Sequence, residues 1–279
     1  MRKNLGKKAV LSFVAMMFAA TNAMAQAGAG AWAKFENGTL TFTCGAKPTI
    51  PSQVTCGGCG KKIARTHKFC SDCGAKNTQD FAVFKVPMAA KNTGEIPWKE
   101  KREDIRKVVF TPSFKRVTNI TSTAYWFYYC NKMTSITGLE NLNTNRVRYM
   151  GSMFKYCESL TSLDVSNFNT SNVTNMGSMF QCCESLTSLD VSNFNTSNVT
   201  DMSGMFMYCK GLTSLDLSNF NTSNATNMWA MFVLCKRLRT IKVSSTGWNL
   251  SKAETYKYKD GRKGTDIMFD ECPAQIIKE

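Results

Sequence analysis

The chain has 279 residues, of which 43% are hydrophobic and 20% are charged, a composition that excludes an intrinsically disordered protein. Its formal net charge of +15 is unevenly distributed: residues 26–149 hold 19 lysines and arginines against 8 aspartates and glutamates, whereas residues 150–279 hold 12 of each. A basic N-terminal region of this kind is either a surface for anionic partners or a solvated face.

The first 25 residues have the pattern of a secretory signal peptide. Four basic residues precede an apolar run at residues 9–20, and the small-x-small cleavage site Ala23-Met24-Ala25 follows. The run is too short for a stable membrane span. We therefore expect an exported protein, extracellular, on the cell surface or in the periplasm, with no membrane span in the mature chain.

Residues 26–55 and 77–119 are predicted to form a β-rich cap. The dipeptide Asn37-Gly38 separates two alternating segments and predicts a β-hairpin over residues 32–43. Further strands are predicted at residues 81–86 and 107–110. We expect this cap to cover the open N-terminal end of the region that follows it, and the densest basic stretch, residues 99–116, belongs to it.

Residues 56–76 contain two C-x-x-C-G turns, with cysteines at Cys56, Cys59, Cys70 and Cys73. Four thiolates in paired turns suit a tetrahedral Zn²⁺ ion with no open coordination position, which is a structural site. The pattern predicts a zinc-ribbon insertion whose folding depends on Zn²⁺, because so short a segment buries little core. Two disulfides are the alternative, since the chain is expected to be exported.

Residues 120–279 contain a repeat of 26 residues. The phrase Met-Phe-x-x-Cys begins at Met153 and recurs in register three times, so that cysteines stand at Cys157, Cys183, Cys209 and Cys235. Looser copies at residues 126–130 and 268–272 bring the number of units to about six. A fixed period of this length indicates units that stack on one another, with atypical units at the ends.

Each unit predicts a strand, a turn and a short helix. Leu163 and Val165 alternate with polar residues, as in a half-buried strand. Apolar residues then fall at i, i+3, i+4 and i+7, which is one face of a helix, at Met176, Met179, Phe180 and Cys183. We therefore expect an α/β solenoid of the leucine-rich-repeat kind, with a parallel sheet and short helices.

The side chains that recur in register are expected to form ladders. The repeated Met, Phe and Cys residues are predicted to stack inside, with the cysteines as small buried hydrophobic residues and a disulfide ladder as the alternative. Asn169, Asn195 and Asn221 are predicted to cap turn backbone along the stack.

The outward positions of the predicted strands form a hydroxyl-rich, acidic strip. A solenoid sheet presents an extended face of this kind to binding partners, although short polar residues also suit a solvated sheet that binds nothing. The predicted binding residues are Ser162, Asp164, Ser166, Ser188, Asp190, Ser192, Ser214, Asp216 and Ser218, called the acidic strip below.

The repeat resembles a known family. The unit Met-x-x-Met-Phe-x-x-Cys-x-x-Leu-Thr-Ser-Leu-Asp-Val-Ser-Asn-Phe-Asn-Thr-Ser-Asn-Val-Thr closely resembles the BspA-like leucine-rich repeat surface proteins, whose repeat is also described as a domain of unknown function in mycoplasmal lipoproteins. The resemblance covers residues 120–272, and residues 56–77 resemble a bacterial zinc ribbon. It implies a secreted or surface protein of bacteria, some relatives of which adhere to host matrix proteins or to other bacteria.

No pattern of catalytic residues stands out. The chain has a single histidine, His67, and the carboxylates of the repeats are copies of one another rather than a differentiated acid–base pair. We therefore expect an adhesion or protein–protein interaction module, not an enzyme, with a host matrix or bacterial surface protein as its partner. The alternatives are binding of anionic glycans or nucleic acid through the basic cap, and a purely structural spacer.

Overall fold

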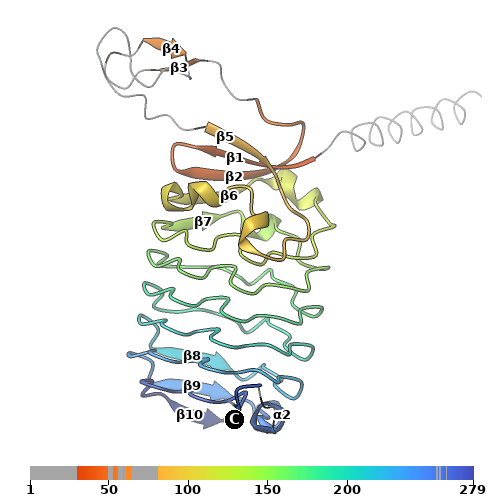
Figure 1. The fold of residues 1–279 in the computed structure, drawn as a ribbon, viewed down its shortest axis with the longest axis vertical. Coiled ribbons are helices and arrows are strands. Elements are labelled where there is room, and N and C mark those ends of the chain that lie inside the picture. Colours follow the sequence, from red (N-terminus) through yellow and green to blue (C-terminus); the bar gives the residue numbers. More distant parts are fainter. Residues whose placement is uncertain are drawn as a thin grey trace, which may run out of the picture.

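The computed structural model describes residues 30–49, 53–55, 59, 61–64, 81–255, 257, 259–261 and 263–279. The predicted signal peptide, residues 1–25, lies outside these residues. The described chain is a column of stacked segments, with strands β1 and β2 at one end and strands β8, β9 and β10 at the other (Figure 1). No helix of the described residues is long and apolar enough to cross a membrane.

The hairpin predicted at Asn37-Gly38 is confirmed. Strand β1 (Gly30–Glu36) pairs antiparallel with β2 (Thr39–Gly45). Both turn residues have positive φ angles, 48° at Asn37 and 76° at Gly38, as the tight turn between two twisted strands requires.

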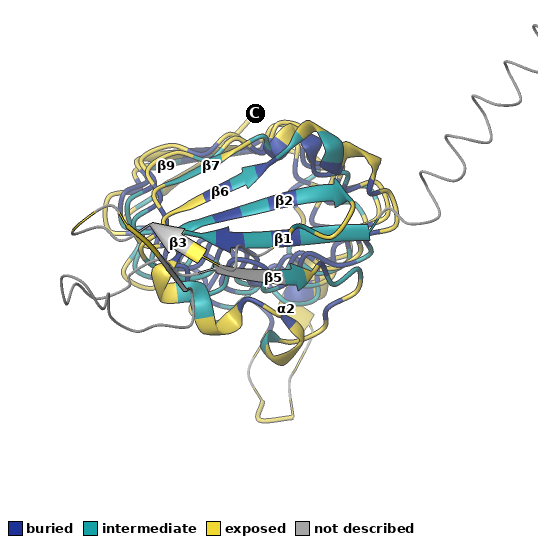
Figure 2. Cartoon of the chain, turned by 90° about the horizontal axis from the view of Figure 1, so that it is seen from above, coloured by how far each residue is buried: buried dark blue, intermediate teal, exposed yellow. Residues whose placement is uncertain are grey.

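This hairpin is the centre of a five-stranded sheet, and Figure 2 shows its strands side by side across the end of the column. Strand β5 (Phe81–Lys85) pairs antiparallel with β1, and β6 (Lys107–Phe110) pairs parallel with β2, at the two positions where strands were predicted. Strand β7 (Ser135–Thr137), from the first repeat unit, pairs parallel with β6. The sheet therefore runs without a break from the N-terminal segment into the repeats.

The described residues also form several short elements. Strands β3 (Gln53–Thr55) and β4 (Lys62–Ala64) form a separate antiparallel pair. The 3₁₀ helices are η1 (Thr93–Glu95), η2 (Lys99–Asp104), η3 (Pro112–Arg116) and η4 (Leu139–Asn141).

An aromatic cluster joins the hairpin to the first repeat unit. The ring of Phe42, on β2, lies 4.5 Å from that of Phe110, 5.3 Å from Trp98 and 5.5 Å from Trp126, measured between centroids. The indole N–H of Trp98 donates to the carbonyl of Trp126 at 2.7 Å. Rings of this size bury large apolar areas, so the cluster anchors the first unit.

The segment predicted to be helical in each unit is a run of turns. The N–H groups of Met179 and Cys183 donate three residues back within the unit, at 3.1 Å each. Two of the three N–H groups between them donate to the next unit instead: Phe180 to the carbonyl of Met205 at 3.0 Å, and Cys182 to that of Met207 at 2.8 Å. An α-helix needs every N–H for its own i−4 carbonyl, so donation between units replaces the helix.

The predicted α/β solenoid is therefore wrong. Among the described residues the only α-helix is α2 (Ser251–Thr255), and it lies outside the segment predicted to be helical. Sheet is also confined to small pieces: β8 (Ser214–Leu217), β9 (Thr240–Val243) and β10 (Gln275–Lys278) form a three-stranded parallel sheet at the C-terminal end. The fold of the described residues is a set of small mixed sheets joined by hydrogen-bonded turns.

The side chains explain why the repeat units do not form the predicted continuous parallel sheet. Residues 163–165 and 189–191 form no strand. The side-chain Nδ2 atom of Asn193 donates to the backbone carbonyls of Val165 at 3.0 Å and Phe168 at 2.9 Å. This side chain therefore occupies acceptors that a neighbouring strand would use.

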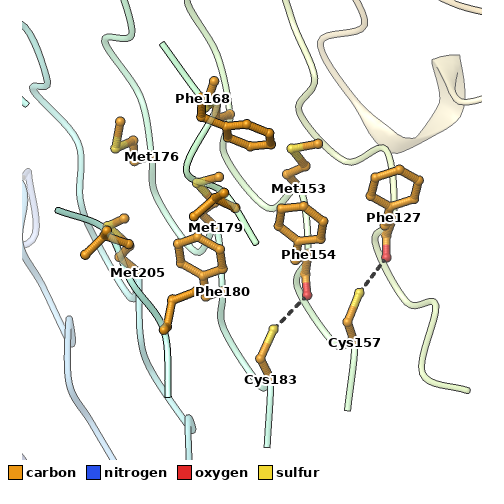
Figure 3. Close-up of a cluster of buried hydrophobic side chains, with 14 of the residues drawn as sticks. Phe127, Met153, Phe154, Cys157, Phe168, Met176, Met179, Phe180, Cys183 and Met205 are labelled. Carbon is orange, nitrogen blue, oxygen red and sulfur yellow. Dashed lines mark hydrogen bonds between the residues drawn. The ribbon is translucent and has the colours of Figure 1, made fainter. Parts of the chain in front are cut away.

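The predicted ladders of apolar side chains are present. Phenylalanine rings stack along the column, with centroids 5.6 Å apart between Phe127 and Phe154 and 5.9 Å apart between Phe154 and Phe180 (Figure 3). The next ring, Phe206, lies 5.9 Å from Phe180. The ladder continues through Phe232 at 5.7 Å to Phe269 at 5.2 Å. Methionines of the same units lie beside the rings and are also fully buried.

The asparagine ladder is confirmed as well, and a threonine ladder adjoins it. The Asn195 side-chain oxygen accepts from the N–H of Ser197 at 3.0 Å, and Asn169 and Asn221 cap their turns in the same way. The residue after each of these asparagines is a buried threonine. Its hydroxyl accepts from the backbone N–H of the asparagine in the following unit and donates to the carbonyl of that same asparagine. These polar ladders hold the units in register.

Candidate binding surface

All nine residues of the acidic strip are exposed, as predicted from their alternation. The strip is more ordered than a row of solvated side chains, because each aspartate bonds its own turn. The Oδ1 atoms of Asp164 and Asp190 accept from the N–H two residues on at 2.9 Å, and that of Asp216 does so at 3.0 Å. The aspartates are thus held in one orientation from unit to unit.

These hydrogen bonds also set the charge of the strip. Bonds from Ser166 lower the pKa of Asp164, and bonds from Ser192 lower that of Asp190. Asp216 has a lowered pKa for the same reason, through Ser218. A donor that bonds the carboxylate favours its ionised form, so the three aspartates carry their charge down to unusually low pH.

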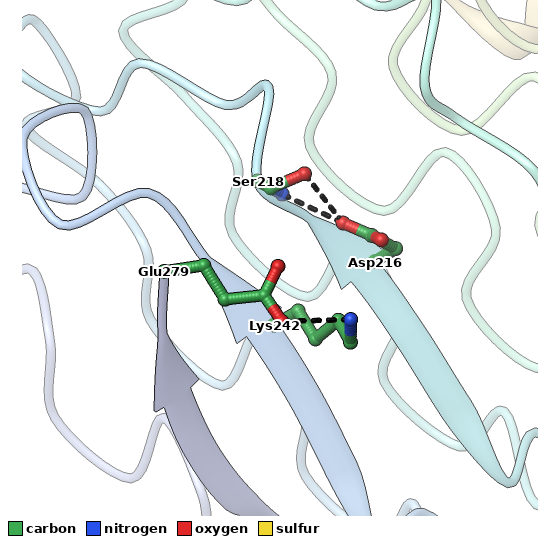
Figure 4. A network of polar contacts seen from close by, with 4 residues as sticks. All are labelled: Asp216, Ser218, Lys242 and Glu279. Atoms are coloured by element: carbon green, nitrogen blue, oxygen red, sulfur yellow. Dashed lines mark hydrogen bonds and ion pairs between the residues drawn. The ribbon is translucent and has the colours of Figure 1, made fainter.

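The strip ends at an ion pair. The Nζ atom of Lys242, on β9, lies 2.7 Å from a carboxylate oxygen of Glu279, beside Asp216 and Ser218 (Figure 4). Lys242 also lowers the pKa of Asp216 by its charge. The strip therefore carries the carboxylates of Asp164, Asp190 and Asp216, with a cation at its C-terminal edge.

The basic stretch at residues 99–116 forms η2, β6 and η3. Its seven lysines and arginines are interleaved with Glu100, Glu103 and Asp104. Two of its guanidinium groups bond backbone: Arg102 donates to the carbonyl of Thr93 at 3.2 Å, and Arg116 to that of Cys44 at 2.9 Å. Part of the basic charge thus holds the N-terminal region together, which leaves less of it for an anionic partner.

A group of tyrosines on the first two units was not predicted as a site. Tyr128 and Tyr129 follow Phe127, and Tyr156 stands in the next unit, where its ring stacks on Tyr129 with centroids 4.2 Å apart. Tyr129 is 41% exposed. The sequence did contain a sign of this group at the two variable positions of the Met-Phe-x-x-Cys phrase. Three of the four variable positions in the first two units hold tyrosine, whereas the third unit holds Gln181 and Cys182 there.

The predicted structural Zn²⁺ site is not supported. In the part of the chain that the structure describes, no three His, Cys, Asp or Glu residues come together to hold a metal ion. Cys56, Cys70 and Cys73 lie outside the described residues, and Cys59 is exposed. A closed tetrahedral site needs four converging ligands, which the described residues do not assemble.

The repeated cysteines are buried thiols. Within the described residues Cys157, Cys183, Cys209 and Cys235 are fully buried and form no disulfides. Each Sγ points at a carbonyl of the preceding unit, with Cys157 at 3.2 Å from the Phe127 oxygen and Cys183 at 3.2 Å from the Phe154 oxygen (Figure 3). Burial raises the pKa of the Cys157 and Cys183 thiols, so they are protonated donors within the core rather than reactive nucleophiles.

The thiol ladder predicts a loss of stability at alkaline pH. The unfolded Cys183 thiol ionises near its ordinary pKa of 9.0, whereas burial keeps the folded thiol protonated, so stability is full below pH 9 and falls above it. Between pH 8 and pH 10 the wild type should lose about 1.4 kcal/mol more free energy of unfolding than Cys183→Ala. Urea unfolding at the two pH values measures this difference. Met179→Leu, a buried change without a titrating group, should retain the wild-type loss, and equal losses in wild type and Cys183→Ala would contradict the prediction.

Comparison with known families agrees with the repeat seen in sequence and structure. The model of the family described as "Mycoplasma protein of unknown function, DUF285" matches residues 111–189 and 164–260, which together cover more than half of the chain. The chain belongs to the DUF285 family. No curated protein and no solved structure matches it.

The DUF285 match covers most of the stacked units. It begins at Thr111, directly before η3, and ends at residue 260, after α2. The acidic strip lies entirely inside this range, whereas β1, β2 and η2 lie before it. The DUF285 description assigns no function.

Proposed function

We propose that this protein is a non-catalytic, exported protein-binding module of the adhesion type, related to the BspA-like surface proteins. The observation that carries the proposal is the acidic strip: nine exposed short side chains in three identical rows, fixed by turn hydrogen bonds on a stack held by buried ladders. A preorganised row of this kind loses little conformational entropy when a partner binds. Export is supported by the N-terminal sequence pattern of residues 1–25.

The chemistry of the strip favours a protein partner. Its hydroxyl groups donate and accept hydrogen bonds, and its three carboxylates accept from amide, hydroxyl and cationic donors. An anionic glycan or nucleic acid would be repelled by Asp164, Asp190 and Asp216. The basic stretch at residues 99–116 supports that alternative less well, because Arg102 and Arg116 bond backbone carbonyls.

The first experiment is capture of partners from host matrix and from neighbouring bacteria, followed by binding measurements with the triple variant Asp164→Asn, Asp190→Asn, Asp216→Asn. Asparagine keeps the side-chain oxygen that caps each turn, so the fold is retained while the charge is lost. Partner binding is expected to weaken at least ten-fold, since charged hydrogen bonds at an interface contribute about 1.5–3 kcal/mol each. Surface plasmon resonance or calorimetry measures the change.

A matched control removes three exposed carboxylates elsewhere, in the variant Glu140→Gln, Glu158→Gln, Glu254→Gln. It should bind like the wild type. Equal weakening in both triple variants would mean that only net charge matters, and unchanged binding in the strip variant would remove the strip as the binding surface. Binding to an anionic polymer that falls steeply with added salt would favour the glycan or nucleic-acid alternative.

A further inference from the structure

A second exposed surface lies between η2 and the first repeat unit, and it shares no residue with the acidic strip. Four tyrosines are in contact there. Ring centroids lie 5.8 Å apart between Tyr125 and Tyr128, 4.7 Å between Tyr128 and Tyr129, and 4.2 Å between Tyr129 and Tyr156. Tyrosine supplies a large apolar contact area with few rotatable bonds, which is why it is common in binding surfaces.

The ring faces of this cluster are not equally accessible. The guanidinium of Arg102 lies over Tyr128 at 5.4 Å from the centroid, and Nζ of Lys155 lies over Tyr156 at 5.3 Å. No cation of the described residues lies over the ring of Tyr129, which is the most exposed of the four contacting rings. The surface already contains two cation–π pairs, and Tyr129 offers the chemistry for a third.

Tyr129 opens onto a cleft of about 480 Å³. Its lining combines Tyr128 and Tyr129 of the first unit with five residues of η2: Lys99, Glu100, Arg102, Glu103 and Asp104. None of the three carboxylates forms an ion pair with another described residue. The cleft is lined by these three carboxylates against two cations, Lys99 and Arg102, so its lining has a net negative charge. The Arg102 guanidinium also lies over Tyr128 and donates to the carbonyl of Thr93.

We propose that this cleft binds an arginine or lysine side chain of a basic segment in a protein partner. A guanidinium stacked on the exposed face of Tyr129 would donate its N–H groups to Glu103 and Asp104. The whole chain has a net charge of +15, so long-range attraction would select acidic ligands. Binding of a basic peptide therefore requires a local acidic site such as this one.

This proposal names a partner chemistry for the protein-binding function proposed above, and it uses a different surface. It can be tested without knowing the natural partner. The probe is the acetylated, amidated peptide Gly-Arg-Gly-Arg-Gly, titrated into the full chain by NMR or calorimetry. A peptide with citrulline in place of arginine has nearly the same shape and no charge, and it is the matched ligand control.

The arginine peptide is expected to bind at least five-fold more tightly than the citrulline peptide. The double variant Glu103→Gln, Asp104→Asn should weaken binding about five-fold, and Tyr129→Leu about three-fold. Both changes are at exposed positions, and a far-ultraviolet circular dichroism spectrum checks that the fold is kept. The strip variant Asp164→Asn, Asp190→Asn should bind the peptide like the wild type.

Three results would overturn the proposal: equal binding of the two peptides, unchanged binding in the η2 and Tyr129 variants, or binding of a neutral oligosaccharide such as cellotriose in place of the arginine peptide. The last result would identify the tyrosines as a sugar-stacking surface instead. The proposed function is tested separately, by whether the strip variant loses partner capture. The peptide titration does not depend on the acidic strip, so the two proposals can fail independently.

Discussion

Replacing Phe180 with alanine is expected to lower the free energy of unfolding by about 4 kcal/mol. Phe180 is fully buried in the middle of the phenylalanine ladder, with rings 5.9 Å away on both sides, at Phe154 and Phe206. Alanine removes the buried ring and leaves a cavity that rigid neighbouring units cannot fill. Urea unfolding followed by circular dichroism measures the loss.

The ladder supplies its own control. Phe269 stacks at 5.2 Å on Phe232 but is only partly buried at the last unit, so Phe269→Ala should cost about half as much. Since each unit contacts only its neighbours, the central substitution should also disturb cooperativity more than the terminal one. A cost below about 1 kcal/mol at Phe180, or an equal cost at both positions, would show that the stack does not depend on its ring ladder.

The side-chain ladders could be predicted from the sequence because identical residues at a fixed period must contact one another when units stack. The run of turns that replaces the predicted helix in each unit could not be predicted. The spacing of Met176, Met179, Phe180 and Cys183 is what a helix face requires, yet successive turns place the same residues inside. The difference lies in the backbone: Ser178 and Cys182 have positive φ angles of 57° and 59°, which the types of these side chains do not indicate.

The exposure of the acidic strip followed from alternation around Leu163 and Leu189, but its fixed orientation did not. An aspartate two residues before a serine N–H becomes a cap only if the chain turns there, and the sequence favoured an extended strand at that point. The tyrosine cleft was also beyond prediction, because it needs η2 to lie against the first unit. The aromatic cluster around Phe42 and Trp98, together with the pairing of β6 with β7, brings these segments together.

The polar ladder should be nearly as important as the apolar one, and Thr196→Val tests it. Thr196 is fully buried; its hydroxyl donates to the carbonyl of Asn221 at 3.0 Å and accepts from the N–H of Asn221 at 2.8 Å. Valine has almost the same shape but satisfies neither group. We expect a loss of about 2–4 kcal/mol in the free energy of unfolding, since each buried unsatisfied backbone group costs about 1–3 kcal/mol.

The matched control is Thr187→Val, the same change at an exposed threonine, which should alter the free energy of unfolding by less than about 0.5 kcal/mol. Hydrogen exchange should also show faster exchange of the Asn221 amide in Thr196→Val, because that N–H loses its acceptor. If Thr196→Val were as stable as the control, the buried hydroxyls would not hold the units in register. The order of the acidic strip would then depend on the apolar ladder alone, and strip geometry should survive in threonine variants but not in Phe180→Ala.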